Sequence, residues 1–332
     1  MENNSFNEIW AKIKKCKNIA MTLHSVPDGD SLGCCTAMKY ILERDLICNV
    51  KLVSYDNVSE NLSKLEYSKE VEFGKDISDL NLVDFDCVIF LDCGSWKNVS
   101  GKLGENFKLK NFIINIDHHD SNSYYGNLNY VDSMAPSACS VLVDFFKSNG
   151  IKFDRELSRR LLLGVCTDSG FFEYDSLPEK ALSDAVFLIG HGADYLNDIL
   201  RPVLYTQPFR IIKYFGLLFN KLKYDSELKC GYTSITLADV KRLGLNKAET
   251  RLGINELQFI GECDFVFNLI EWENEIKGSF RSKKGVNVAI LAKELGGGGH
   301  KAAAAFVLKK MPLDQAEKFV LDSVRRVGIK KI

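Results

Sequence analysis

The sequence predicts an α/β fold, with an N-terminal mostly parallel sheet flanked by helices and a smaller C-terminal α/β domain. Short apolar runs alternate with amphipathic segments over residues 1–190, the pattern of strands that alternate with helices. The runs CVIFLD at 87–92 and FIINID at 112–117 are apolar at nearly every position, as expected for strands covered on both faces. The chain has 332 residues, which exceeds the usual size of one core, so we expect two domains.

The N-terminal elements follow from these runs in chain order. We expect strands at 19–23 (IAMTL), 47–54 (ICNVKLVS), 87–92 and 112–117, and helices at 31–44 (SLGCCTAMKYILER) and 137–150 (SACSVLVDFFKSNG). The second helix ends at a glycine, a common helix stop. A further helix-like run, LLLGVCTD, ends at Asp168. We assign residues 1–190 to the first domain.

The C-terminal elements restart after a predicted helical linker at 191–222, which Pro202 and Pro208 should break. Over residues 223–332 we expect a second domain with a strand at 230–237, a helix at 238–245, a hairpin at 264–282, an amphipathic helix at 286–295 and a strand at 302–308. The run GGGGH precedes the last strand. It is either a flexible loop or a loop whose backbone N–H groups approach an anion.

Composition excludes several classes of protein. No apolar run reaches the roughly 20 residues of a membrane span, and the polar N-terminus lacks the apolar core of a signal peptide. We therefore expect a cytoplasmic protein with no membrane partner. The ten cysteines form no C-x-x-C pair. We interpret them as reduced thiols that pack as small apolar side chains, with a zinc or disulfide framework as the alternative.

Charge bounds the nucleic acid that such a chain could bind. Lys and Arg number 43 and Asp and Glu 44, so the formal charge is −1. A protein that grips long nucleic acid through its phosphates should be clearly basic. From residue 277 onward, however, 13 Lys and Arg stand against 4 Asp and Glu. A nucleic-acid ligand is therefore expected to be short and to bind near the C-terminal part of the chain.

Ionisable residues gather at four places, three after predicted strands and one at the end of a helix-like run. They are His24, Asp28 and Asp30 after the first strand, Asp92 after CVIFL, Asp117, His118 and His119 after FIINI, and Asp168 after LLLGVCT. Each has an ordinary alternative: Asp30 could cap the following helix, and Asp92 could be a cap or a salt-bridge partner. Ligands of an open parallel sheet sit at the carboxyl ends of its strands, so we expect these side chains to gather at one edge.

Carboxylates and imidazoles without a cysteine suit Mn²⁺ or Mg²⁺ better than a thiolate zinc site. So many negative groups would repel one another without cations. Pairs of divalent metals about 3.5–4 Å apart are common in enzymes that displace phosphoesters. The pattern therefore predicts a centre that holds two divalent ions.

In this order and spacing, HSVPDGDSLG, LDCGS, IDHH and TDSG resemble the four motifs of the DHH phosphoesterase family. GSFRSKKGVNVAILAKELGGGGHKAAAAF resembles the DHHA1 domain that follows in one branch of that family. The length and domain pair are most similar to the bacterial oligoribonuclease (nanoRNase)/pAp phosphatase group. One mild departure is Cys93, which stands where relatives often have Thr or Ser. After His300, the run Ala302 to Ala305 replaces the glycine of the common Ala-Ala-Gly or Ala-Ser-Gly.

The resemblance implies a role for each candidate residue. His24, Asp28 and Asp92 would bind one metal, and Asp30, Asp92, His118 and Asp168 the other, with Asp92 bridging. His119 would face the scissile phosphate, and Asp117 would orient the histidine pair. Substrate contacts would come from Arg281, Ser282, Gly298, Gly299 and His300. The cofactors would be two divalent ions, with Mn²⁺ preferred.

The implied activity is a metal-dependent phosphodiesterase that hydrolyses short oligonucleotides (nanoRNA) to mononucleotides by attack of a metal-activated water on phosphorus. Hydrolysis of pAp to AMP is a further candidate activity. The alternatives are a cyclic di-AMP or pApA phosphodiesterase and, more remotely, an inactive nucleotide-binding regulator. Short single-stranded RNA, DNA or a nucleotide is the expected partner, and a homodimer is a candidate assembly.

Overall fold

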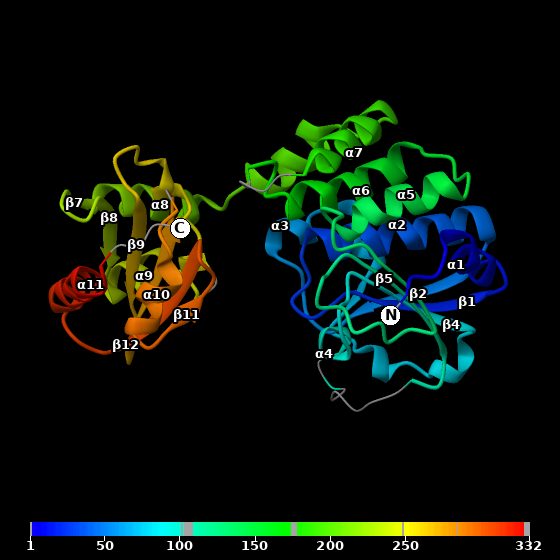
Figure 1. The fold of residues 1–332 in the computed structure, drawn as a ribbon, viewed down its shortest axis with the longest axis horizontal. Helices are drawn as coiled ribbons and strands as arrows, with labels where there is room; N and C mark the ends of the chain where they lie inside the picture. The colour runs from blue at the N-terminus through cyan, green and yellow to red at the C-terminus, as the bar shows by residue number, and fades with distance from the viewer. Residues whose placement is uncertain are drawn as a thin grey trace. The chain divides into compact units, whose positions relative to one another are not determined.

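The computed structural model describes residues 2–100, 102, 109–173, 178–247, 249–283 and 285–328. It divides into two units, Met1–Thr206 and Gln207–Ile332, each with its own six-stranded sheet (Figure 1). The predicted mixed α/β class is confirmed. The division after Thr206 lies within the stretch 191–222 that we predicted as a linker.

The sheet of the first unit is parallel at every strand pair, in the order β3-β2-β1-β4-β5-β6. The strands are β1 (Asn18–Thr22), β2 (Asn49–Ser54), β3 (Glu72–Phe73), β4 (Cys87–Leu91), β5 (Phe112–Asp117) and β6 (Leu128–Val131). The four predicted strands are confirmed. The two additional strands, β3 and β6, lie at the sheet edges, where short runs leave a weak sequence signal.

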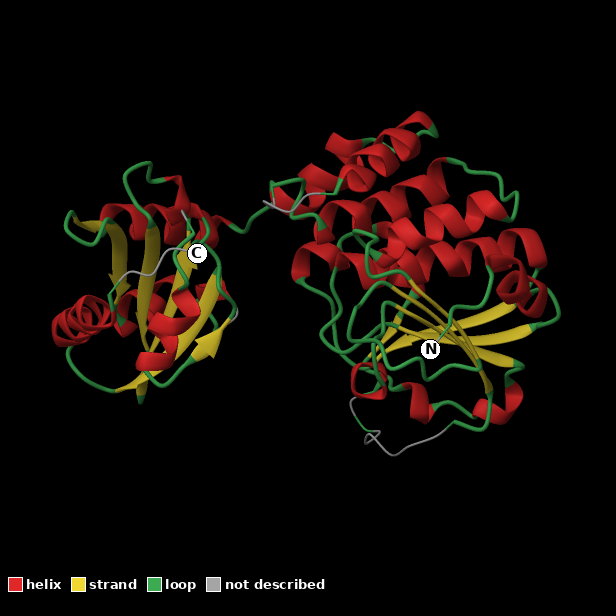
Figure 2. Ribbon diagram, viewed as in Figure 1, coloured by secondary structure: helices red, strands yellow, loops and turns green. Residues whose placement is uncertain are grey.

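The long helices α2, α5 and α6 cover one face of this sheet, and short helical segments, including α4, cover the other (Figure 1, Figure 2). The helices are α1 (Phe6–Ile13), α2 (Gly29–Leu46), α3 (Glu60–Ser63), α4 (Trp96–Val99), α5 (Ala138–Ser148), α6 (Arg155–Asp168) and α7 (Glu179–Gly190). Alternate residues of a strand point to opposite faces. Ile89 and Leu91 of β4 therefore pack into the core that α2, α5 and α6 share, while Val88 and Phe90 pack into the core on the other face. Burial on both faces explains the continuous apolar run.

The connection between the two units differs from the prediction at one proline. Pro202 lies inside a π-helix, Tyr195–Leu204, instead of breaking a helix. Backbone bonds from a residue to the fifth before it, such as Tyr205 N to Leu200 O at 2.9 Å, widen the turn. The wider turn accommodates a proline ring that an α-helix would exclude. Pro208 lies, as predicted, outside a helix and caps α8.

The second unit has a mixed sheet in the order β11-β12-β10-β9-β8-β7. Its strands are β7 (Lys223–Asp225), β8 (Cys230–Ile235), β9 (Phe265–Glu271), β10 (Glu275–Ser282), β11 (Gly298–Gly299) and β12 (Ala303–Lys309), and its helices are α8 (Phe209–Asn220), α9 (Leu237–Leu243), α10 (Val288–Glu294) and α11 (Leu313–Val327). The predicted hairpin is confirmed as β9 and β10. Within the described ranges, no helix has both the length and the apolarity needed to cross a bilayer.

Candidate metal centre and substrate pocket

The strand order places three predicted site segments next to one another. β1, β4 and β5 are neighbours in the sheet, and the chain order reverses between β1 and β4. His24 follows the end of β1, Asp92 follows β4, and His118 follows β5. In open parallel sheets, ligands bind beyond the carboxyl ends of the strands at such a reversal. The sheet therefore brings these side chains to the position where this architecture holds ligands.

Asp92 lies at the centre of the cluster. Its Oδ2 atom is 3.3 Å from His24 Nε2, and its Oδ1 atom is 3.4 Å from His118 Nε2 and 3.6 Å from His119 Nδ1. The side chain is 3% exposed. Its backbone adopts the left-handed conformation, with φ 57°, which costs a residue other than glycine about 1 kcal/mol or more. The fold tolerates this strain where it directs a buried carboxylate toward three imidazoles.

Asp28 joins the cluster from the start of α2. It is the N-cap of this helix, and its Oδ1 atom accepts hydrogen bonds from the Asp30 and Ser31 amides, each at 3.0 Å. The same oxygen lies 3.6 Å from His24 Nε2. The expectation that Asp30 could cap this helix is therefore wrong, because Asp28 does so. Asp28 thus combines the capping role with a position in the His24, Asp28 and Asp92 group.

Asp30 instead points toward a different helix. Its carboxylate is fully buried and accepts hydrogen bonds from the Ala138 and Cys139 amides, at 2.6 and 3.0 Å, at the start of α5. The N-terminus of a helix favours an anion. Asp30 Oδ2 lies 3.9 Å from His118 Nε2, which is also 3.3 Å from Asp168 Oδ2 at the end of α6. Asp30, His118 and Asp168 thus form a second group whose ligand atoms converge.

The electrostatics of the cluster favour bound cations. Burial and the neighbouring Asp92 raise the pKa of Asp30 to about 7. Burial, with Asp30 and Asp92 nearby, raises the pKa of Asp168 to about 9. Burial lowers the pKa of His24, but hydrogen bonds with Asp28 and Asp92 outweigh it and raise that pKa to about 11. Asp30 and Asp168 therefore resist ionisation, and His24 retains its proton. Divalent metal ions would displace these protons, and this set of oxygen and nitrogen donors fits such ions.

His119 differs from the other histidines in its partner and exposure. Its Nδ1 atom lies 2.8 Å from Asp117 Oδ1, and its side chain is 42% exposed while Asp117 is buried. The hydrogen bond with Asp117 raises the pKa of His119. Asn122 Nδ2 donates to the other oxygen of Asp117 at 2.5 Å and to Asn115 Oδ1 at 2.8 Å. A buried chain of amides therefore holds the carboxylate that orients His119.

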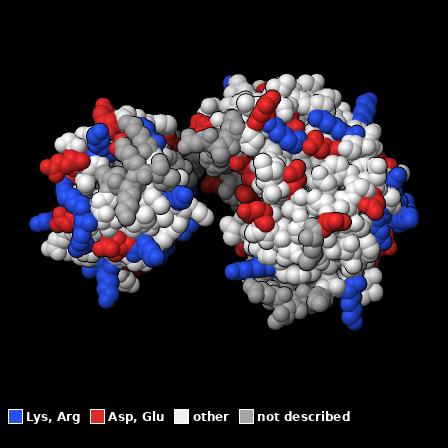
Figure 3. Space-filling model, viewed as in Figure 1, with Lys and Arg blue, Asp and Glu red and all other residues white. Residues whose placement is uncertain are grey.

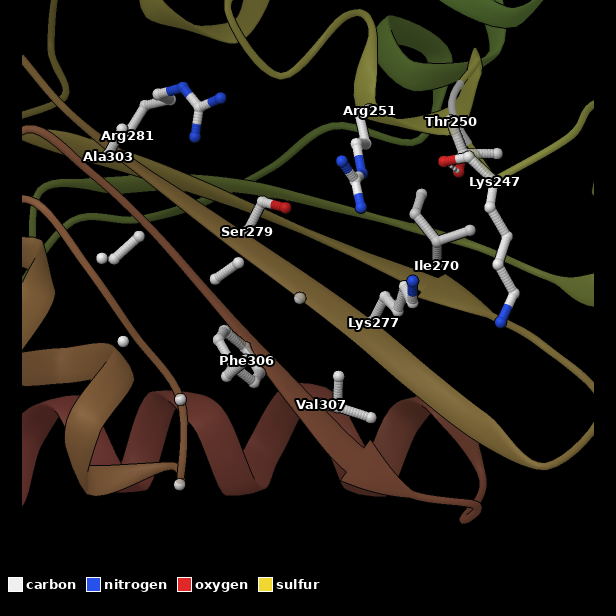
Figure 4. Close-up of a pocket in the computed structure, with 17 residues that line it drawn as sticks. Lys247, Thr250, Arg251, Ile270, Lys277, Ser279, Arg281, Ala303, Phe306 and Val307 are labelled. Atoms are coloured by element: carbon white, nitrogen blue, oxygen red, sulfur yellow. Dashed lines mark hydrogen bonds between the residues drawn. The ribbon is translucent and has the colours of Figure 1, made fainter. Parts of the chain in front are cut away.

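The predicted substrate residues lie at a pocket in the second unit (Figure 4). The cavity has a volume of about 580 Å³, and its lining includes Arg281, Gly298 and Gly299. Gly298 and Gly299 form the edge strand β11, so the expectation of a flexible loop is wrong for these two residues. Ser282 and His300 are outside this lining and flank it in the chain. His300 forms a turn whose backbone N–H donates to Ala303 O at 2.8 Å.

Sequence reasoning missed several residues that the structure adds to these sites. Asn122 supports the pair of Asp117 and His119 from a loop that carries no motif. Lys247, Arg251 and Lys277 also line the pocket that contains Arg281. The position of Lys277 could have been predicted, because it stands four residues before Arg281 in a predicted strand and so lies on the same face of that strand. The positions of Asn122 and Arg251 depend on the folding of loops and had no comparable signal.

Comparisons with known proteins match both units. Residues 18–165 match the model described as the DHH family, N-terminal domain, and residues 238–327 match the DHHA1 domain. A probable bifunctional oligoribonuclease and PAP phosphatase from Streptococcus mutans is 28% identical over 90% of this chain and 92% of its own length. A bifunctional oligoribonuclease and PAP phosphatase from Thermus thermophilus is 31% identical over 65% of each chain.

A solved structure shares the fold over nearly the full length. The crystal structure of an exopolyphosphatase-related protein from Bacteroides fragilis aligns with a TM-score of 0.81 at 19% sequence identity. The alignment covers 97% of this chain and 96% of that protein.

Proposed function

Since this chain belongs to the DHH family of phosphoesterases and carries a DHHA1 domain, we propose that it hydrolyses short oligonucleotides to mononucleotides, with pAp as a further candidate substrate. It is a hydrolase of phosphoester bonds by family. The relatives described as oligoribonucleases and PAP phosphatases support the finer assignment. The observation that carries the proposal is the convergence of three histidines and four aspartates, with Asp92 at the centre of the group.

Six of these residues would hold two divalent cations, with Mn²⁺ preferred. His24, Asp28 and Asp92 would hold one, and Asp30, Asp92, His118 and Asp168 the other. When bound, such a pair supplies the charge neutralisation and the activation of water that phosphoester hydrolysis requires. Ligand atoms converge in three groups among the described residues, and none of the groups contains a cysteine. The groups His24, Asp28 and Asp92 and Asp30, His118 and Asp168 support this assignment, while the third adds His119 to Asp92 and His118.

The protein's own acid would be His119. Its Nδ1 atom is held by Asp117, so its Nε2–H is the group available to a substrate. A protonated imidazole there would stabilise negative charge on the phosphoryl oxygens or donate a proton to the leaving oxygen. The hydrogen bond with Asp117 raises the pKa of His119, which favours the protonated imidazole.

Asp117 would act through His119 as a positioning residue. Its buried carboxylate fixes the imidazole ring, as acceptors behind reactive or ligating histidines commonly do. The amide of Asn122 holds the carboxylate in turn. Burial raises the pKa of Asp117, but His119 and Asn122 outweigh it and hold that pKa below its usual value. The carboxylate therefore stays ionised beside His119.

Surface charge supports a short substrate. In the view of Figure 3, Lys and Arg are interspersed with Asp and Glu on both units, without a broad basic face. Long nucleic acid is bound by extended rows of cations. The basic side chains of the pocket that contains Arg281 instead offer a local site for a few phosphates.

One assay separates the candidate activities. Purified protein with Mn²⁺ is offered a 5′-labelled dinucleotide, a 24-mer RNA, pAp and cyclic di-AMP. We expect cleavage of the dinucleotide and pAp and slow cleavage of the 24-mer. Rapid cleavage of the 24-mer would contradict the short-substrate proposal, and a preference for cyclic di-AMP would favour the alternative phosphodiesterase. No cleavage with metal bound would favour an inactive regulator.

A further inference from the structure

One face of β10 carries a row of polar side chains into the pocket of the second unit. Residues 276, 278 and 280 are buried in the core, so Lys277, Ser279 and Arg281 share the opposite face by strand alternation. All three line the cavity, and Figure 4 shows them in this order along the strand. The Cα atoms of Lys277 and Arg281 are therefore roughly 13 Å apart.

Arg281 is held at its own end of this row by neutral acceptors. Its Nε–H donates to Asn255 Oδ1 and an Nη1–H donates to Phe280 O, each at 2.9 Å. These bonds orient the guanidinium, and the planar group suits a phosphate. Because Arg281 is fixed there, it does not extend along β10 toward Lys277.

At the other end of the row, Lys277 and Arg251 have no counter-ion. Among the described residues, neither side chain forms an ion pair or a hydrogen bond, although both line the cavity. The neighbouring carboxylates are already engaged, since Glu275 accepts from Lys247 at 2.8 Å and Glu249 accepts from Arg210. No Asp or Glu belongs to the described lining. Lys277 and Arg251 therefore face the cavity without a paired carboxylate in the described part of the chain, although Glu275 lies near enough to Lys277 to interact with it electrostatically.

The segment that carries Arg251 is anchored. Its neighbour Thr250 is buried, and the Tyr214 hydroxyl donates to Thr250 O at 2.9 Å. Thr250 N also donates to Asn246 O at 3.1 Å. Figure 4 shows the guanidinium of Arg251 directed toward β10. A cation on an anchored backbone loses less entropy on binding a ligand than one on a free loop.

Two alanines of the neighbouring strand β12 stand beside this row and line the cavity. Across from Lys277, Ser279 and Arg281 in the register stand Val307, Ala305 and Ala303 of β12. Gly278 has no space for a side chain, because a Cβ atom there would lie 2.0 Å from the Phe306 ring. Ala303 and Ala305 leave room beside Arg281 and Ser279 for an extended oligonucleotide, while Val307, Ile270 and Phe306 add apolar surface to the lining.

We propose that Arg251 and Lys277 form a second phosphate subsite, which binds a phosphate of an oligonucleotide beyond the one bound at Arg281. Because Lys277 and Arg281 are separated along β10 and Arg281 is fixed in position, one phosphate could not contact both side chains. We therefore expect each end of the row to bind its own phosphate. The inference rests on the proposed function and deepens it, because the second subsite would favour substrates of three or more nucleotides. A mononucleotide such as pAp has too few phosphates to occupy the metal centre and both subsites.

The test compares substrates of different length in matched variants. Arg251→Gln, Lys277→Gln and the double variant are measured against Lys318→Gln, which removes an exposed lysine of α11 outside the pocket. With Mn²⁺, we expect the double variant to lower the ratio of kcat/KM for pApApA to that for pAp about tenfold, through KM. The control should leave this ratio unchanged. A double variant with an unaltered ratio, or with equal losses on both substrates, would overturn the subsite.

Binding in EDTA separates this proposal from the proposed function. Equilibrium binding of labelled pApApA is measured as a function of salt. Each lost cation should reduce the slope of log K against log salt by about 0.7. Wild-type protein that cleaves none of the substrates would contradict the proposed function, yet the slopes would still decide the subsite. A slope that is the same in wild type, the double variant and Lys318→Gln would overturn it.

Discussion

Replacing Asp92 with asparagine tests the candidate metal centre at its most connected carboxylate. The two oxygens of Asp92 face His24 at 3.3 Å, His118 at 3.4 Å and His119 at 3.6 Å. Asparagine has a similar volume and tolerates the left-handed backbone of this position, whereas alanine would add strain. The substitution therefore removes one negative charge and leaves the local conformation nearly unchanged.

The expected losses follow from the position of Asp92 in both halves of the cluster. Even residues that only support metal ligands change metal affinity by about 10- to 100-fold, so a shared ligand should cost at least about 100-fold. Bound divalent metals supply several kcal/mol of transition-state stabilisation, and each ~1.4 kcal/mol is tenfold, so kcat/KM should fall about 1000-fold. Without metal, Tm should change little, because Asp92 repels Asp30 and Asp168 and raises their pKa values, but also pairs with His24 and His118.

Three measurements on one preparation check this reasoning. Calorimetric titration with Mn²⁺ gives the affinity, thermal unfolding in EDTA gives the stability, and hydrolysis of pApA gives the rate. Asp120→Asn is the matched control, since it removes an exposed carboxylate next to His119 that forms no ion pair with any described residue. Wild-type Mn²⁺ affinity in Asp92→Asn would refute the assignment. A large drop in Tm in EDTA would show that Asp92 supports the fold instead.

Three further predictions concern the same unit. His119→Gln should lower kcat by about 100- to 1000-fold while Mn²⁺ affinity stays nearly constant, and a parallel loss of affinity would make His119 a ligand instead. Asn122→Ala should lower kcat about tenfold with little change in KM, because Asp117 loses a donor; a change in KM alone would contradict the positioning role. Mn²⁺ should raise Tm more at pH 8 than at pH 6. The pKa values of Asp30 and Asp168 are raised to about 7 and about 9, so in the metal-free protein their protons stabilise the fold at low pH. This stabilisation is lost as pH rises through those values, and metal then competes with fewer protons; equal Tm shifts at both pH values would contradict the linkage.

The buried strands were predictable because their physical signal is local. CVIFL of β4 is fully buried, and a short, continuous run of apolar and β-branched residues is typical of a buried strand. The edge strands β3 and β6 lack that signal, since water satisfies one side of an edge and the side chains are mixed. Pro202 misled the prediction for a similar reason. A proline reliably breaks an α-helix, but the π-helix it occupies depends on how the neighbouring segments pack.

The candidate site was partly predictable because strand ends in a parallel sheet share an edge. His24, Asp92 and His118 needed only the strand order to be brought together. The exact use of each carboxylate needed the structure. Asp30 lies two residues after Asp28 in the chain, yet it accepts from the amides of α5, more than a hundred residues away. Such long-range hydrogen bonds leave no periodic trace in a single sequence.

The formal charge of −1 includes the acidic side chains of the candidate metal centre and the excess of Lys and Arg from residue 277 onward. Asp28, Asp30, Asp92 and Asp168 carry four negative charges when ionised, which two divalent cations would balance. Only the loaded cluster would therefore offer a phosphate the charge of bound metal ions. The unpaired cations of the second unit attract phosphate in either state. Substrate binding in EDTA should consequently depend on the second unit alone, and turnover should require both.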